Sequence, residues 1–143
     1  MFRLIVKYLK FFKHVPFFAL WLDAAMMITN MIFRPEVIRS IEKIEGEVST
    51  WKDVTLTLHK FGGLQFNCGE TELGHIHSNG ILDVLLSRKM KHSLMNEGRV
   101  KDHHVFKKSG WTSFYIRSSR DVNKAVYLLA LSYRRITGRD AGS

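Results

Sequence analysis

The stretch "DVTLTLHKFGGLQFNCGETELGHIHSNGILDVLL", residues 53–86, decides the fold class because apolar and polar side chains alternate in it between glycine turns. The apolar positions on either side of Gly62-Gly63 are Val54, Leu56, Leu58, Leu64, Phe66 and Cys68, and the polar ones before the turn are Thr55, Thr57 and His59. Period-two alternation around a glycine turn predicts a β-hairpin.

Two further strands are expected at residues 71–77 and 81–86, joined through Ser78-Asn79-Gly80. Residues two apart in a strand point to the same face, so His75 and His77 are expected to face together. By the same rule, Leu73 shares their face and Ile76 points to the other.

Helical patterns surround these strands. Val37, Ile38, Ile41 and Ile44 follow a 3.6-residue period after Pro35, and Gly46 is expected to end that helix. Ser87 caps an expected helix at 87–97, a last strand is expected at 111–117, and Ser118 with Asp121 starts a final helix that ends at Gly138. The sequence therefore predicts an α+β fold: a mainly antiparallel four- to five-stranded sheet covered by helices, with extra N-terminal helices.

The N-terminal segment, residues 1–34, is hydrophobic and basic and differs from the domain expected at 35–143. Pro16 and Asp23 interrupt its apolar run, which disfavours a membrane span. Two interpretations remain: helices packed on the domain core, or peripheral membrane contact through residues 1–33.

Composition narrows the function classes. Cys68 is the single cysteine, which excludes an intrachain disulfide and a cysteine-based zinc site and favours a reducing, cytoplasmic location. The net charge of +9 could attract nucleic acid, anionic lipid or an acidic small molecule. No nucleic-acid-binding motif accompanies that charge, so we expect no nucleic-acid partner. Nucleotide-binding motifs are absent as well.

Two histidine pairs carry the candidate chemistry. His75 and His77 form the first, and His103 with His104 forms the second, in a loop before the last strand. Adjacent residues of an extended segment face opposite ways, so one member of the second pair is expected to join the first, and we expect His104. Asp83, within an apolar run, is either a pocket-facing carboxylate or a strand-edge group. Three imidazoles from His75, His77 and His104 form a workable zinc site, and Asp83 could instead complete a two-histidine, one-carboxylate iron site.

Four segments, "LGHIHSNGILDVLLSRKM", "EGRVKDHHVF", "SGWTSFYIRS" and "LLALSYRR", resemble a bacterial luciferase-domain family that is distantly similar to fungal luciferase. The resemblance covers about residues 35–137. It implies His75, His77 and His104 as catalytic residues. With it we expect a substrate-binding set of Trp111, Thr112, Tyr115, Asp83 and His103.

The resemblance also implies an activity: an oxygenase that combines a hispidin-type hydroxypyranone with O2 and uses no cofactor. A histidine can remove the enol proton near neutral pH, and donors such as the Trp111 indole and the Tyr115 hydroxyl can stabilise a developing oxyanion. The alternatives are a histidine-ligated zinc or iron enzyme, and a non-catalytic protein that binds a ligand or a membrane surface.

Overall fold

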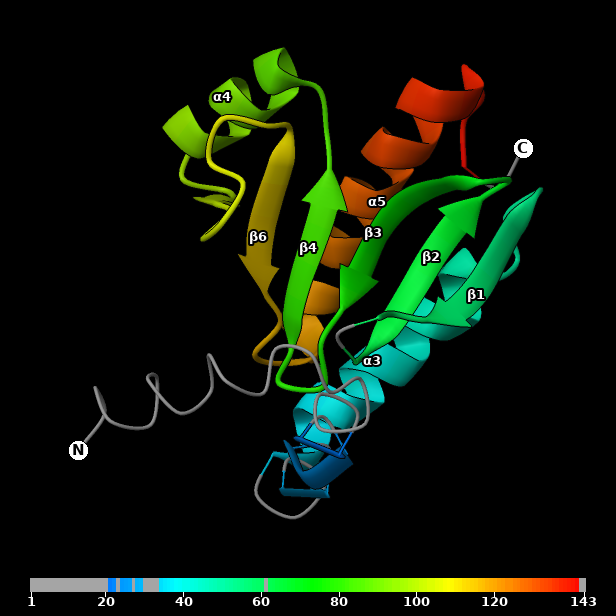
Figure 1. The fold of residues 1–143 in the computed structure, drawn as a ribbon, viewed down its shortest axis with the longest axis vertical. Coiled ribbons are helices and arrows are strands. Elements are labelled where there is room, and N and C mark those ends of the chain that lie inside the picture. Colours follow the sequence, from blue (N-terminus) through cyan, green and yellow to red (C-terminus); the bar gives the residue numbers. More distant parts are fainter. Residues whose placement is uncertain (1–20, 23, 27, 30–33, 61, 142–143) are drawn as a thin grey trace.

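The computed structural model describes residues 21–22, 24–26, 28–29, 34–60 and 62–141. Its centre is an antiparallel sheet of six strands in the order β1-β2-β3-β4-β6-β5 (Figure 1). The strands are β1 (Val54–Leu58), β2 (Leu64–Cys68), β3 (Thr71–Ile76), β4 (Ile81–Leu85), β5 (Lys101–Asp102) and β6 (Trp111–Tyr115). The predicted α+β class is confirmed. The sheet is larger than predicted because β5 is only two residues long, too short for a period to show in the sequence.

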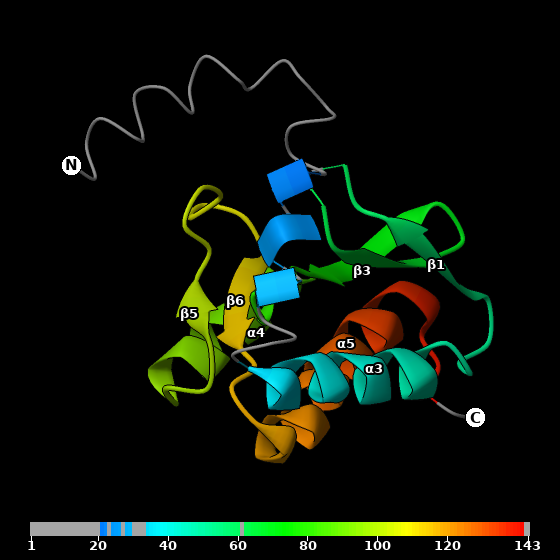
Figure 2. The ribbon, with the colours of Figure 1, turned by 90° about the horizontal axis from the view of Figure 1, so that it is seen from below.

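The helices are α3 (Pro35–Val48), α4 (Arg88–Asn96), the short 3₁₀ helix η2 (Ser119–Asp121) and α5 (Val122–Thr137). Figure 2 shows α3 and α5 side by side on the same face of the sheet. The predicted caps are present: the Ser87 hydroxyl accepts from the Met90 amide at 3.2 Å, and Ser118 forms a capping box with Asp121.

The prediction that Gly46 ends the first helix is wrong. Helix α3 continues through it to Val48, whose side chain is buried in the core together with that of Ile44. Burial of Val48 contributes about 1.5–3 kcal/mol, which outweighs the cost of about 0.5–1 kcal/mol for a glycine within a helix.

The core lies between the sheet and the pair α3 and α5. Phe66, Leu82 and Val84 point into it from the strands, and Leu129 and Tyr133 point into it from α5. Cys68 is also buried there.

A β-bulge changes which side chains of β3 share a face. Phe66 of β2 pairs with Gly74, but the next residue, Asn67, pairs with Glu72. Leu73 is therefore the extra residue, and it is buried in the core with Ile76. The expectation that Leu73 lies on the face of His75 is wrong, because a bulge shifts the alternation by one residue. Glu72 takes that place instead, bonded to His75.

Of the N-terminal segment, the described residues between 21 and 29 are helical, and Thr29 donates a hydrogen bond to the Ala25 carbonyl. The rest of the predicted helical segment 1–33 lies outside the described residues. Within the part of the chain that the structure describes, every helix is too short or too polar to cross a membrane.

Candidate functional site

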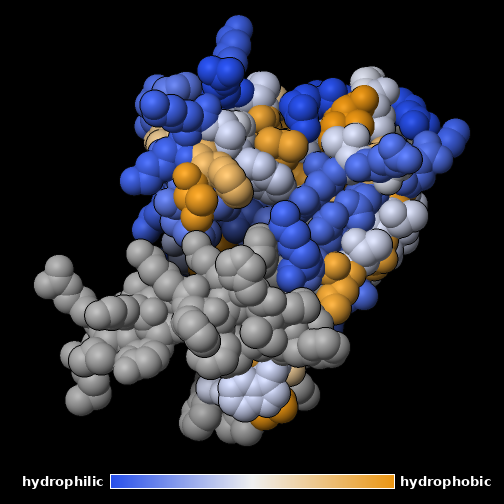
Figure 3. Space-filling view, in the orientation of Figure 1, coloured by the Kyte–Doolittle hydropathy of each residue, from blue (hydrophilic) through white to orange (hydrophobic). Residues whose placement is uncertain are grey.

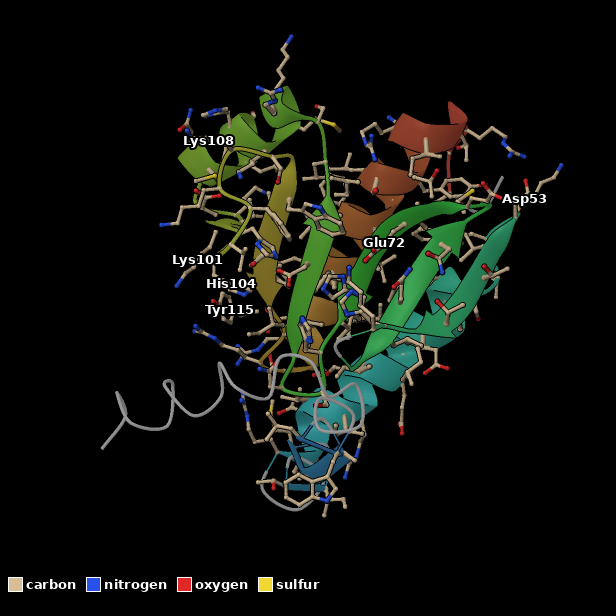
Figure 4. All side chains as sticks on the ribbon, in the orientation of Figure 1. Asp53, Glu72, Lys101, His104, Lys108 and Tyr115 are labelled. Carbon is tan, nitrogen blue, oxygen red and sulfur yellow. The ribbon has the colours of Figure 1, made fainter. Side chains whose placement is uncertain are left out.

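The candidate site lies on the sheet face opposite to α3 and α5. Register pairs His75 with Asp83 and Asp83 with Ser113, so directly opposed residues form a polar row across β3, β4 and β6. Figure 4 looks onto this face, with Glu72 over β3 near its centre. In Figure 3 the same side of the molecule is mostly hydrophilic, with isolated hydrophobic residues.

Asp83 is the centre of the site, and its side chain is fully buried. Its Oδ1 accepts a hydrogen bond of 2.5 Å from the Ser113 hydroxyl. Its Oδ2 faces three imidazole Nε2 atoms, those of His75 and His77 at 3.5 Å each and that of His103 at 3.6 Å. We call these four residues (His75, His77, Asp83 and His103) the Asp83 cluster.

The distances around Oδ2 are longer than hydrogen bonds, whose donor and acceptor lie about 2.7–3.2 Å apart. Among the described residues, Oδ2 accordingly has no hydrogen-bond partner. A buried carboxylate oxygen without a partner costs free energy, so such an atom is rare and points to a role beyond stability. Burial opposes the ionisation of Asp83, but the imidazoles of His75 and His77 and the Ser113 hydroxyl outweigh it and lower the pKa of the carboxyl.

A carboxylate faces each ring nitrogen of His75. Its Nδ1 lies 2.6 Å from Oε1 of Glu72, while its Nε2 points at Asp83. Burial by itself lowers the pKa of His75, yet the two carboxylates together raise it to about 9. The protein therefore holds this ring in one orientation between two acids.

His59 is a member of the site that sequence reasoning missed. Its ring stacks on that of His75, with centroids 3.8 Å apart, and only 5% of the residue is exposed. Burial and the neighbouring His75 lower the pKa of His59 to about 4. His59 follows β1 and looked like one more polar residue of an edge strand. The available signal was the hairpin register, which places it at the same end of the sheet as residues 75–77.

His77 directly follows β3, and its backbone closes the turn into β4. Its amide donates to the Ile81 carbonyl, and its carbonyl accepts from the Gly80 amide, each at 2.9 Å. About 24% of its side chain is exposed, against 9% for His75 and 6% for His103. Of the three imidazoles that face Asp83, His77 is therefore the one most open to solvent.

The second histidine pair contributes His103, and the expectation that His104 joins the cluster is corrected. His104 is exposed and stacks on the outer side of His103, with ring centroids 4.5 Å apart. The His103 Nδ1 accepts hydrogen bonds from the amides of Val105 at 3.1 Å and Phe106 at 3.0 Å, which turns the loop and directs its Nε2 toward Asp83. Burial lowers the pKa of His103.

Lys91 of α4 fixes this loop. Its side chain is 5% exposed, and its ammonium group donates to the carbonyls of Lys107 at 2.9 Å and Ser109 at 3.1 Å. It also lies 2.6 Å from Oδ1 of Asp102, the residue before His103. A buried ammonium with three oxygen partners holds both ends of the loop that carries His103.

The aromatic strand β6 divides the remaining predicted residues between two faces. Trp111 lies beside the cluster, with ring centroids 5.6 Å from His75 and 6.2 Å from His103. Tyr115 is 40% exposed, and the cations of Lys101 and Arg117 lie over its ring. Thr112 is buried on the core side, where its hydroxyl donates to the Val84 carbonyl at 3.3 Å. Strand alternation thus separates Thr112 from the cluster.

An apolar groove of about 310 Å³ lies elsewhere, between α3 and the ends of the first hairpin. It is lined by Ile38, Ile41, Glu42, Glu45, Leu58, Gly63, Leu64, Ile76 and Ser78. None of these described lining residues is a histidine, so we place the chemistry at the Asp83 cluster rather than in this groove.

One comparison with known proteins gives a match. Residues 70–132 match the family model of the Luciferase domain. The match runs from just before β3 into α5, so it contains the whole Asp83 cluster and leaves out His59. No curated protein and no solved structure matches the chain. The resemblance to a luciferase-domain family is confirmed over this part of the sequence.

Proposed function

From the luciferase-domain match over residues 70–132, we propose that this luciferase-like protein is an oxygenase that combines an enolisable hydroxypyranone with O2 at the Asp83 cluster. The observation that carries the proposal is the convergence of three imidazoles on one buried carboxylate within the matched region. Such convergence of ionisable groups is typical of catalytic sites.

Removal of the enol proton is assigned to His77. It is the cluster histidine with the most exposed side chain, so a substrate on the open face of the sheet can reach it. Loss of that proton to His77 leaves an electron-rich enolate whose carbon adds to O2. The O2 is reduced to the peroxide level with an O–O single bond, and its outer oxygen takes the proton back from His77. Positioned acid–base catalysis of this kind typically contributes about 10²–10⁴-fold to a rate.

His103 supplies a hydrogen-bond donor for the developing negative charge. Its Nδ1 accepts from two backbone amides, so the proton of the neutral ring is on Nε2. That N–H points toward the cluster from a ring held fixed by the loop. A donor fixed before the reaction stabilises an oxyanion without the cost of reorienting.

The surroundings suit a flat, anionic substrate. Trp111 offers an aromatic face next to His75 and His103. Figure 4 shows Lys101, Lys108 and Tyr115 on the β5–β6 side of the same face. Exposed lysines there attract an enolate or a carboxylated pyranone.

The test is oxygen uptake with a panel of hydroxypyranones, with light emission recorded in the same cuvette. We expect substrate-dependent uptake by the wild-type chain and a loss of at least about tenfold in His77→Ala. The matched control is His92→Ala, which removes an exposed imidazole of α4 and is expected to leave the rate unchanged. Oxygen uptake that is absent in the wild type, or equal in the two variants, overturns the proposal.

A further inference from the structure

We propose that His75, His77 and Asp83 bind a divalent transition-metal ion through the two Nε2 atoms and Oδ2, with at least one coordination position left for an oxygen ligand from outside the chain. One possible ligand atom of each of the three residues lies within 4.8 Å of those of the other two. The proposal goes beyond the oxygenase function and differs from the expectation of a cofactor-free reaction. With an ion bound, the Nε2 atom of His77 is a ligand, so the assignment of His77 as the base applies only to the metal-free protein.

The distances fit ligands of one ion better than hydrogen bonds. Atoms bound at about 2.0–2.2 Å from one ion lie about 3.3–3.6 Å apart in tetrahedral geometry and about 2.8–3.1 Å apart in octahedral geometry. The Asp83 Oδ2 lies 3.5 Å from the Nε2 atoms of both His75 and His77. These separations match the tetrahedral range.

The carboxylate is suited to be a ligand because its Oδ2 is buried and has no hydrogen-bond partner among the described residues. Its other oxygen accepts from Ser113, which fixes the direction in which Oδ2 points. A cation bound to Oδ2 satisfies an atom that no donor among the described residues reaches.

A second group, His59 with Glu72 and His75, also brings three ligand atoms within 4.8 Å. The contact between the His75 Nδ1 and Oε1 of Glu72, however, is 2.6 Å long. That distance is a hydrogen bond, and it is too short for two ligands of the same ion. Glu72 is therefore the carboxylate that orients a metal-bound histidine, a partner that such histidines almost always have.

Hydrogen bonding at each Nδ1 decides which imidazoles bind the ion. The His75 Nδ1 donates a hydrogen bond to Oε1 of Glu72, which leaves Nε2 as the nitrogen that can bind a cation, and a cation bound there displaces the Nε2 proton. The His103 Nδ1 accepts two amide protons, so its Nε2 carries a proton and cannot bind a cation. His103 is thus excluded as a fourth protein ligand, and the site keeps the open position that is typical of catalytic metal centres.

The test uses the full chain after treatment with a chelator. Co²⁺ and Zn²⁺ are titrated separately, with the visible absorption of Co²⁺ and elemental analysis as readouts. We expect about one equivalent of each metal and a Co²⁺ spectrum of low coordination number. Affinity falls at least about tenfold in Asp83→Asn and in His77→Ala, while His92→Ala binds like the wild type. Fe²⁺, titrated without oxygen, shows whether the site also accepts a redox-active ion.

Glu72→Gln tests the assignment of Glu72 as a positioning residue. It should weaken binding about 10–100-fold and leave the coordination number from the Co²⁺ spectrum unchanged. X-ray absorption on the Co²⁺-loaded wild type covers the case in which a variant does not fold. We expect the spectrum to show outer-shell scattering from two imidazoles. A spectrum without imidazole scattering overturns the proposal.

Two further results overturn the metal site: less than about a tenth of an equivalent bound by the wild type, or unchanged affinity in a folded Asp83→Asn. Oxygen uptake separates this proposal from the oxygenase proposal. Hydroxypyranone-dependent uptake by protein with less than a tenth of an equivalent of metal rejects the metal and keeps the oxygenase. Tight metal binding without any oxygen uptake keeps the metal site and rejects the oxygenase.

Discussion

His75 and Asp83 are directly opposed across β3 and β4, so an imidazole and a buried carboxylate share one face of the sheet. The pairing depends on the close approach of the two strands at Gly74. A Cβ at Gly74 would lie 2.5 Å from the carbonyl oxygen of Asp83 itself. Strand register and one small residue thus place the two groups that define the site.

Gly74→Ala is predicted to destabilise the fold by about 1–3 kcal/mol, because the added methyl group overlaps the backbone of β4. The matched control is Gly46→Ala, at an exposed position of α3 with no atom within 4 Å of the new Cβ. That substitution is predicted to stabilise by about 0.5–1 kcal/mol. Denaturant unfolding measures the stability of both variants. If both are stabilised, or both are destabilised, the strand contact at Gly74 or the helix around Gly46 is misplaced.

Lys91→Met is predicted to loosen the loop that carries His103. It removes the buried ammonium group that donates to Lys107 and Ser109. We expect a loss of about 1–3 kcal/mol in stability and faster hydrogen exchange at the Val105 and Phe106 amides. Lys89→Met, an exposed change on the same helix, provides the control. Equal exchange rates in the two variants would contradict this account of the loop.

Truncation of His103 is predicted to slow hydroxypyranone-dependent oxygen uptake far more than truncation of His104. The His103 Nε2 faces Asp83 at 3.6 Å, whereas His104 is exposed and stacks on the ring of His103. Steady-state rates of His103→Ala and His104→Ala, at substrate concentrations below and above KM, make the comparison. A larger loss in His104→Ala would restore the expectation drawn from the sequence.

In metal-free protein, stability is predicted to fall as the pH rises from about 6.5 to above 9. The folded-state pKa of His75 is about 9, above the ordinary value of 6.5. The folded chain therefore binds more protons than the unfolded chain in this window. The stabilisation is complete below 6.5 and is lost as the pH passes 9, by an amount on the order of 3 kcal/mol.

Glu72→Gln tests the cause of this pH dependence. Part of the pKa shift of His75 comes from Glu72, so the variant should lose less stability over the same window than the wild type. Unfolding free energies at half-unit pH steps, in the presence of a chelator, give both curves. Parallel curves would mean that Glu72 does not raise the pKa of His75.

Most of the fold could be predicted from periodicity alone. Alternation located β1 to β4, and the caps at Ser87 and Ser118 located α4 and the start of η2 and α5. Strand β5 escaped prediction because two residues carry no period. The end of α3 was placed too early because a local glycine signal was weighed without the burial of Val48.

The site was predicted in part. His75 and His77 do face together, and both face Asp83. The alternation predicts this correctly because the bulge in β3 lies before His75 and not between the two histidines. Leu73 was assigned to the wrong face because a bulge leaves no mark in single-sequence alternation. The choice between His103 and His104 depended on two amide hydrogen bonds within a loop. The position of His59 beside His75 follows from the pairing register of β1 and β2 with β3, and not from the residues around His59 in the sequence.

The most direct test of the central claim, that the Asp83 cluster is the functional centre, is hydroxypyranone-dependent oxygen uptake by Asp83→Asn. The substitution keeps the size of the side chain and removes the charge that three imidazoles face. We predict a rate at least about 100-fold below wild type in a variant with an unchanged far-UV circular dichroism spectrum. A folded Asp83→Asn that consumes oxygen at the wild-type rate would contradict the account.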